Sequence, residues 1–169
     1  MRKSNGLTSV LVKINERYNV LKTAYNQRMN ELIEMTSKLN SNTSEDSVKL
    51  AALLQQKIYS CSEIIIQFQS WLDDIQSLEI VDGLEKKLNI LYTHTRNEFN
   101  TLEELQILVK DYLKTQISDT PLIKEVQKTL KNMIKLLTDS KHNTNKQIED
   151  IYSALFNKRK LIDSLSEHI

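Results

Sequence analysis

The chain has 169 residues, of which 40% are hydrophobic and 27% are charged, and its formal net charge is +1. This length fits one domain, and the balanced charge argues against nucleic acid as a partner, because proteins that neutralise phosphates carry a marked basic excess. The chain contains 2 glycines and 1 proline. β-Folds need turn residues at nearly every chain reversal, so this composition predicts long α-helices joined by few turns.

The start of the chain and its longest apolar run predict a soluble protein. Residues 1–5 lead into a segment with polar residues every few positions, unlike the apolar core of a signal peptide. The apolar run at 64–66 is far shorter than the ~20 residues that span a bilayer. The single cysteine, Cys61, permits a reducing compartment. We therefore expect a cytoplasmic or nuclear protein.

The first half of the chain predicts two helices. The first runs from about Thr8 to Lys38, and the polar segment 39–44 ends it. Thr43 or Ser44 is expected to cap the second helix, which runs from about 45 to 80. Apolar residues recur in both helices at three- and four-residue steps, which places them on one stripe. The stripe of the first helix consists of Leu11, Ile14, Tyr18, Leu21, Tyr25, Leu32, Met35 and Leu39. The stripe of the second helix consists of Leu50, Leu54, Ile58, Cys61, Ile65, Phe68, Leu72, Ile75 and Leu78.

The second half predicts two more helices. The clearest break in the chain is 81–83, where Asp82 and Glu85 have the spacing of a capping box for a third helix that continues to about Leu113. Pro121 suits the first turn of a fourth helix, because its missing N–H would be unpaired there. This helix has about 45 residues, or roughly 70 Å, so we expect its last turns to project beyond the bundle or to bend. Short connections then predict an all-α antiparallel bundle of three to four long helices.

The sequence lacks the motifs of common catalytic, cofactor and metal sites. Gly6 and Gly83 are too far apart for a phosphate-binding loop, and the cysteine and histidines lack the spacing of metal ligands. His94 and Glu98 share a helix face and could supply a general base. A surface hydrogen bond or a half-buried histidine is the commoner outcome of this spacing. We therefore predict no enzyme, no cofactor and no metal.

Two further residues have both a structural and a functional interpretation. Cys61 lies on an apolar stripe, which favours a small buried hydrophobe over a reactive thiol. Trp71 has apolar neighbours, which favours a core anchor over an exposed hot spot for a partner.

A further pattern lies in four segments, 14–21, 68–74, 102–105 and 121–148. These segments resemble pieces of spectrin repeats, the three-helix units of spectrin, α-actinin, dystrophin and nesprin. Residues 14–21, with Tyr18 in the aromatic place and Arg28 in the basic place, resemble the family's third helix. Residues 68–74, which include Trp71, are similar to its first helix.

The later segments extend this resemblance. His94 with the segment 102–105 is similar to the family's second helix, and 121–148 is similar to another third helix. Here Ile134 and Thr144 replace the expected aromatic and basic residues. An internal repeat aligns Ile14, Tyr18, Leu21 and Leu32 with Leu130, Ile134, Leu137 and Ile148.

The resemblance implies a domain organisation and a function. Residues 1–40 would be the last helix of a preceding repeat, or the first helix of a four-helix bundle. Residues 44–169 would be a three-helix unit with an extended last helix. The implied function is a non-catalytic structural or scaffold module of a cytoskeletal or nuclear-envelope assembly, which acts as a spacer and a protein-interaction surface.

The last predicted helix continues an apolar stripe where we expect the other helices to have ended. Such a stripe calls for a partner helix from another protein or, in a homodimer, from a second copy of this chain. We expect protein partners through helix–helix contacts, and neither nucleic acid nor membrane. The alternative function is a helical adaptor or tethering subunit in membrane trafficking, such as a SNARE-regulatory or BAR-like bundle. The stripe consists of Ile151, Leu155, Phe156, Leu161, Ile162 and Leu165.

Overall fold

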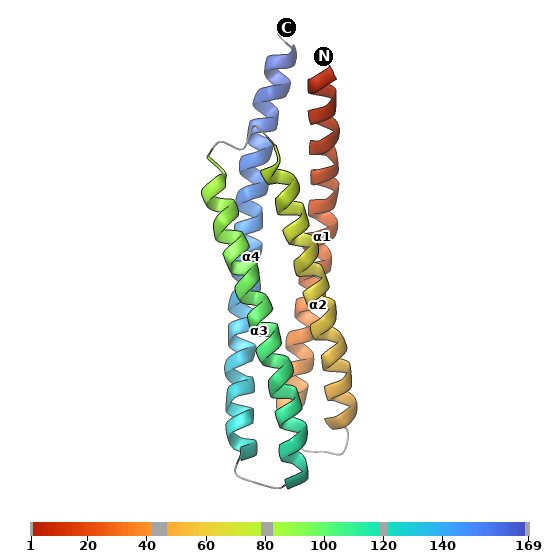
Figure 1. The fold of residues 1–169 in the computed structure, drawn as a ribbon, viewed down its shortest axis with the longest axis vertical. Helices are drawn as coiled ribbons and strands as arrows, with labels where there is room; N and C mark the ends of the chain where they lie inside the picture. The colour runs from red at the N-terminus through yellow and green to blue at the C-terminus, as the bar shows by residue number, and fades with distance from the viewer. Residues whose placement is uncertain (1, 42–46, 79–82, 119–121, 168–169) are drawn as a thin grey trace.

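The chain folds into four long helices that pack lengthwise in an antiparallel bundle (Figure 1). This computed structural model describes the backbone of residues 2–41, 47–78, 83–118 and 122–167, and the side chains of 9–40, 48–78, 83–114 and 124–156. The helices are α1 (Arg2–Ser41), α2 (Ser47–Gln76), α3 (Glu85–Ser118) and α4 (Leu122–Glu167).

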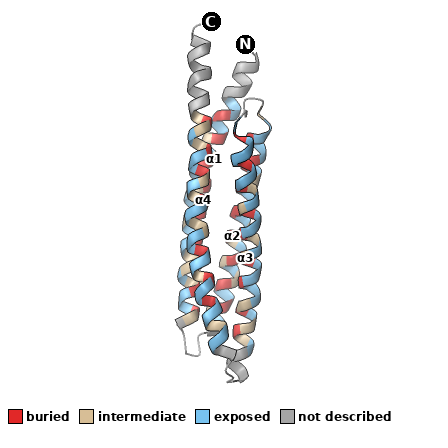
Figure 2. Ribbon diagram, turned by 90° about the vertical axis from the view of Figure 1, so that its left-hand side faces the viewer, coloured by how far each residue is buried: buried red, intermediate tan, exposed pale blue. Residues whose placement is uncertain are grey.

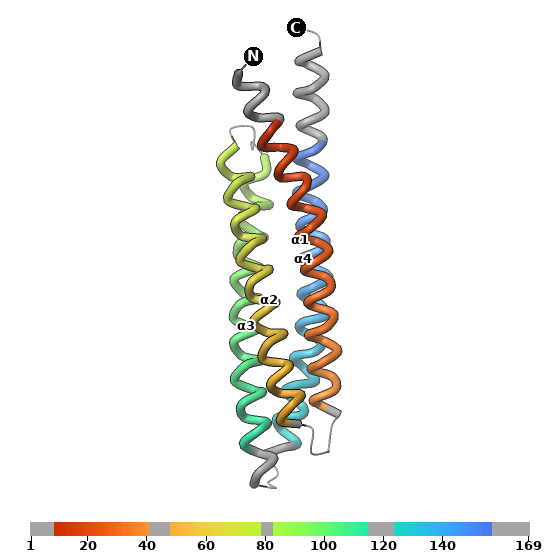
Figure 3. The backbone as a smooth tube through the Cα atoms, turned by 90° about the vertical axis from the view of Figure 1, so that its right-hand side faces the viewer, coloured from red at the N-terminus to blue at the C-terminus, as the bar shows by residue number. Residues whose placement is uncertain are grey.

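Helix α1 belongs to the same bundle as the other three helices. It packs against α2 on one side and α4 on the other, while α3 packs against α2 and α4. Figure 3 shows α1 beside α4 and α2 beside α3, and neighbouring helices run in opposite directions. The prediction of an antiparallel bundle of long helices is therefore confirmed, and residues 1–40 supply a helix of that bundle.

Two helix boundaries differ from the sequence prediction. α1 begins at Arg2 and not near Thr8, because the single Gly6 in this segment costs only about 1 kcal/mol in a helix. α2 ends at Gln76 and not at Ile80. Beyond that end the N–H of Leu78 donates to the carbonyl of Ile75 at 3.1 Å, a three-residue step that tightens the last turn.

The connection from α2 to α3 contains a residue whose backbone only glycine adopts readily. Gly83 has a φ of 91°, in the left-handed region that residues with a Cβ rarely occupy. The predicted capping residues Thr43, Ser44 and Asp82 lie outside the described residues.

A single core runs along the inside of the bundle, and Figure 2 shows that buried residues recur along every helix. The predicted stripes supply most of it. In α2 all stripe residues are buried except Leu50 and Leu78, which are partly buried. In α1 the stripe also takes in Met29, which the sequence analysis left out. The largest fully buried side chains are those of Trp71, Tyr25, Tyr112 and Phe68.

The length of α4 sets the shape of one end of the bundle. It has 46 residues against 30 in α2 and 34 in α3, and it extends past the connection between those two helices (Figure 1). The N-terminal end of α1 lies beside it, so the projection is a pair of helices. Within the described residues, no helix combines the length and apolar character needed to cross a bilayer.

Candidate functional site

A buried acid lies in the middle of the core. Glu98 of α3 is 4% exposed, although ionisable side chains are almost never buried without partners. Its position continues the apolar stripe of α3, seven residues after Leu91 and four before Leu102, both of which are buried. The helix period therefore turns this carboxyl inward among the side chains of all four helices.

The other helices supply hydrogen-bond donors to this carboxyl. The Tyr25 hydroxyl of α1 donates to Oε2 of Glu98 at 2.6 Å, and the Thr144 hydroxyl of α4 donates to Oε1 at 2.7 Å. On α3 itself, Nε2 of His94 lies 3.7 Å from Oε1 of Glu98 and 3.2 Å from the carbonyl oxygen of Ser140. We call these five residues the polar layer; it joins α1, α3 and α4.

Burial dominates the electrostatics of the polar layer. Removal from water raises the pKa of the Glu98 carboxyl, while the hydroxyls of Tyr25 and Thr144 oppose this effect by donating to the charged form. Burial and the nearby Glu98 raise the pKa of Tyr25 well above its ordinary value, so the phenol stays protonated and remains a donor. From α2, burial raises the pKa of Cys61 to about 12.

Beside the polar layer, a pair of amides joins α1 to α4. The side chains of Asn26 and Asn145 exchange two hydrogen bonds, of 2.9 and 2.7 Å. These residues directly follow Tyr25 and Thr144 in the chain. A shift of α4 along α1 by one turn would break both Asn26–Asn145 bonds and the bond from Thr144 to Glu98, so these contacts fix the axial register of α4 against α1 and α3.

In this arrangement the buried polar groups form hydrogen bonds with one another. Both carboxylate oxygens have hydroxyl donors from other helices, which is what keeps a buried polar network from destabilising the fold. His94 is half-buried, as one of the two sequence interpretations predicts, and it bridges α3 to α4. Cys61 is fully buried and its thiol is protonated at neutral pH, which confirms its interpretation as a small core residue.

Spacing along one helix identifies Glu98 and His94 but not their partners on the other helices. Tyr25 was read as an apolar stripe residue, and Thr144 only as a departure from the spectrin pattern. A signal for Thr144 existed, because Glu98 and Thr144 each occupy a position on an otherwise apolar stripe, whereas nothing in the sequence distinguishes Tyr25 from its apolar neighbours. Two polar residues at core positions of different helices predict a contact between them.

The predicted partner-binding stripe on α4 divides into two parts. Ile151 and Leu155 are fully buried in the core, so the expectation that they are open to a partner is wrong. The reason is that α1 extends to the same end of the bundle and covers them. Phe156 is half-buried with its ring 4.2 Å from that of Tyr152. The side chains of Leu161, Ile162 and Leu165 lie outside the described residues.

Tyr152 packs this part of α4 against α1. Its ring stacks on Tyr18 at 3.9 Å, and its hydroxyl donates to Oδ1 of Asn15 at 2.7 Å. We expect Tyr152→Ala to lower the free energy of unfolding by about 2 kcal/mol, because it removes both the stacking and the hydrogen bond. Tyr152→Phe keeps the ring and should lose about 1 kcal/mol. Urea titrations measure both, and equal losses in the two variants would show that the stacking contributes nothing.

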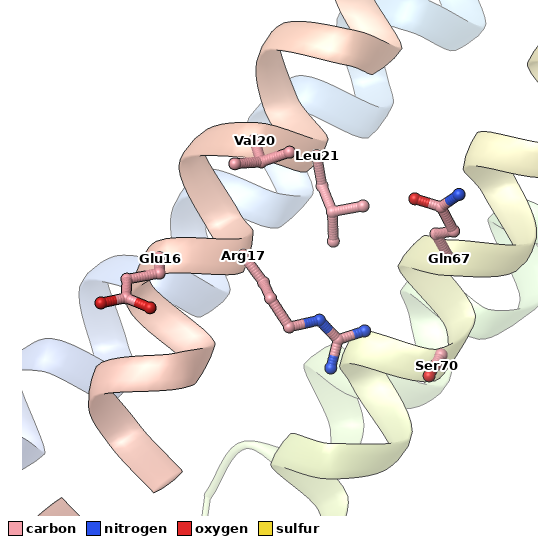
Figure 4. A pocket seen from close by; sticks show the side chains of 6 residues that line it. All are labelled: Glu16, Arg17, Val20, Leu21, Gln67 and Ser70. Carbon is pink, nitrogen blue, oxygen red and sulfur yellow. The ribbon is translucent and has the colours of Figure 1, made fainter. Parts of the chain in front are cut away.

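The surface between α1 and α2 carries a shallow groove of about 430 Å³ (Figure 4). Arg17 reaches across it from α1 and forms an ion pair with Asp74 of α2, and the buried Leu21 points toward α2 at its floor. Its other lining residues are Glu16, Val20, Gln67 and Ser70.

Two further observations complete the description of candidate sites. In the described part of the chain, His, Cys, Asp and Glu side chains do not gather in a group that could hold a metal ion. Comparison of the chain with protein-family models, curated proteins and solved structures finds no match.

Proposed function

We propose that this protein is a non-catalytic structural module of spectrin-repeat type. It acts as a spacer and a protein-interaction surface in a cytoskeletal or nuclear-envelope assembly. The observation that carries this proposal is the lengthwise packing of four helices of 30 to 46 residues around one continuous core (Figure 2).

The dimensions of the bundle suit a spacer. At a rise of about 1.5 Å per residue, α4 is about 70 Å long, whereas packed helices lie only about 8–10 Å apart. Side-chain packing from Leu11 to Leu155, the part of the core that the structure describes, resists bending, because interiors at crystal-like density have low compressibility. Partners attached at the two ends would therefore be held at a fixed distance.

The contacts that the buried ionisable side chains form also support a structural role. Glu98, Tyr25 and His94 are the residues with which an enzyme could move protons. Here Tyr25 of α1 donates to Glu98 of α3, and His94 of α3 lies beside Glu98 and contacts the carbonyl oxygen of Ser140 in α4.

Small-angle scattering with in-line light scattering tests the spacer. A rod of this length should give a radius of gyration of about 20 Å as a monomer, against about 16 Å for a compact chain of the same size. The elongated value at the monomer mass is the expected result. A compact monomer would contradict the proposal.

The same measurement tests the end of α4 as an interaction surface. A chain that stops after Phe156 keeps the core residues Ile151 and Leu155 and lacks Leu161, Ile162 and Leu165. We expect this shorter chain to stay monomeric when the concentration is raised until the 169-residue chain begins to associate. Association of both chains to the same extent would exclude these three residues from the contact.

A further inference from the structure

The outward face of α2 carries a strip of uncharged residues. Its members follow one another at steps of four and three residues, the spacing with which one helix packs along another in a coiled coil. Its bulkiest residues are open to solvent, since Tyr59, Val48 and Ile66 are 68%, 67% and 55% exposed. We call this set the outer strip, and it consists of Val48, Ala52, Gln55, Tyr59, Ser62 and Ile66.

The outer strip does not contribute to the core of its own chain. The buried residues of α2, such as Leu54 and Ile58, occupy the opposite side of the helix. The outward face of α4 shows the more usual composition, because it carries the exposed residues Lys128, Lys131 and Lys135. Single exposed apolar residues are common on protein surfaces, whereas a row of them without any charge favours a contact with another protein.

The outer strip is complementary to a second copy of itself that runs in the opposite direction. Its steps are four, three, four, three and four residues, so the order of steps is the same from either end. Two such strips can therefore pack face to face about a two-fold axis, with every residue opposite a residue of the other strip. The opposed pairs are then Val48 with Ile66, Ala52 with Ser62, and Gln55 with Tyr59.

Two charges beside the outer strip select this antiparallel arrangement. Lys49 directly follows Val48 and Glu63 directly follows Ser62, so both charges lie on the same edge of the strip. In the antiparallel pair, Lys49 of each copy comes within ~3 Å along the helix axis of Glu63 of the other copy. A parallel pair would leave them ~21 Å apart along the axis. The contact thus contains the same ion pair twice, which favours a second copy as the occupant.

Contacts within the chain leave these two charges open to a second copy. In the part of the chain that the structure describes, Lys49 forms no ion pair, and the nearest base to Glu63 is Arg28 at 4.0 Å. The other charge of α2 on the side toward α1, Lys57, already pairs with Glu31 at 2.7 Å.

The flank of the outer strip formed by α3 does not repel a second copy. Gln69 of α2 donates to the hydroxyl of Thr95 at 3.2 Å, and the two helices run antiparallel, so the segment of α3 after Thr95 lies beside the strip. Charged residues outside the core balance in this segment, and they are Arg96, Lys110 and Lys114 against Glu103, Glu104 and Asp111. The same balance argues against an anionic membrane as the occupant.

We propose that the outer strip of α2 binds the outer strip of a second copy of this chain in an antiparallel, two-fold symmetric contact. The strip is one helix wide and about 27 Å long from Val48 to Ile66, which is the scale of small, transient interfaces. The contact is therefore weak, and it forms above the concentration at which the chain begins to associate through the end of α4. It pairs two bundles lengthwise, and the proposed spacer does not require it.

Disulfide cross-linking between two variants of the 169-residue chain tests the contact. One variant carries Val48→Cys and the other carries Ile66→Cys, because these positions are opposed in the antiparallel pair. Each position is about 27 Å from its own equivalent in the second copy, too far for a disulfide. Each variant alone is therefore the matched control for the mixture. The native Cys61 is fully buried and does not compete. Non-reducing gels measure the linked dimer after mild oxidation.

We expect the mixture to give about fivefold more linked dimer than either variant alone at the same total concentration. Glu63→Lys in both chains should lower this yield about fivefold, because it places a lysine beside Lys49 of the other copy. Adding Lys49→Glu to both chains should restore the yield, since the ion pair is then present with its signs exchanged.

Three results would overturn the proposal. They are equal yields from the mixture and from the single variants, a yield that Glu63→Lys leaves unchanged, and no linked dimer at concentrations where the chain associates. The last result would place the association elsewhere, for example at the end of α4. Scattering at low concentration measures the radius of gyration of the monomer, so failure of the spacer and failure of this contact are distinguishable.

Discussion

Replacement of Trp71 by alanine is expected to lower the free energy of unfolding by about 3–5 kcal/mol, the usual cost of removing a large buried aromatic side chain. Trp71 is fully buried, its indole N–H donates to the carbonyl oxygen of Ile14 at 3.0 Å, and its ring contacts Tyr18 and Phe68. The variant loses the packing of α1 against α2 and leaves a cavity that the neighbouring rings cannot fill. Thermal melts followed by circular dichroism should show a midpoint about 6–20 °C lower.

A matched control comes from the same helix. Tyr59 is 68% exposed, so Tyr59→Ala should change stability by no more than about 0.5 kcal/mol. Phe68→Ala should resemble Trp71→Ala, because Phe68 is also buried and packs edge-on against Tyr25. Similar small changes in all three variants would contradict the placement of these aromatic residues in the core.

The second large effect is expected at Glu98. Glu98→Ala leaves the hydroxyls of Tyr25 and Thr144 buried without an acceptor, which should cost about 2–5 kcal/mol for the two groups together. Glu98→Gln retains an oxygen that accepts from Thr144 and an amide that donates to the Tyr25 oxygen. Because its amide is neutral at every pH and never has to bury a charge, it should be at least as stable as the natural chain at neutral pH. Urea titrations of the variants measure the difference.

The stability difference between the natural chain and Glu98→Gln should depend on pH. Burial raises the pKa of Glu98 above its ordinary 4.5, so the folded chain binds this proton more tightly than the unfolded chain does. The stability contributed by the proton is fully present below pH 4.5 and is lost as the pH rises through the folded pKa. The advantage of Glu98→Gln over the natural chain should therefore grow between mildly acidic and neutral pH.

Other titrating groups around Glu98 define the controls for this measurement. Tyr25 faces it from α1, Cys61 from α2 and His94 from its own helix, while α4 contributes the hydroxyls of Thr144 and Ser140. The raised pKa values of Tyr25 and Cys61 keep both neutral across the range tested. Repeating the titrations with His94→Gln in both chains removes the imidazole. A pH-independent difference in that background would contradict the raised pKa of Glu98.

The fold could be predicted from the sequence because it rests on local rules. The scarcity of glycine and proline allowed only a few chain reversals, and apolar residues such as Leu54, Ile58 and Ile65 recur with the period of an α-helix. These patterns specify which residues of a helix turn inward. They placed Trp71 and Cys61 in the core and predicted the antiparallel bundle, both of which the structure shows.

The pairing of the helices could not be predicted in this way. A helical period says which face of α4 is apolar, but it does not say which helix covers that face. Ile151 and Leu155 were therefore assigned to a partner, whereas α1 covers them through contacts such as that between Tyr18 and Tyr152. The length of α1 and its place beside α4 are properties of the assembled bundle.

The polar layer likewise combines features that the sequence predicts with contacts that it does not predict. The sequence by itself placed Glu98 and His94 on one helix face, since this follows from their spacing along one helix. Only the tertiary structure brought Tyr25 from 73 residues away and Thr144 from 46 residues away to the two carboxylate oxygens. Contacts between distant segments depend on the axial register of helices, and that register is set by packing and buried hydrogen bonds between them, not by the period of any one helix.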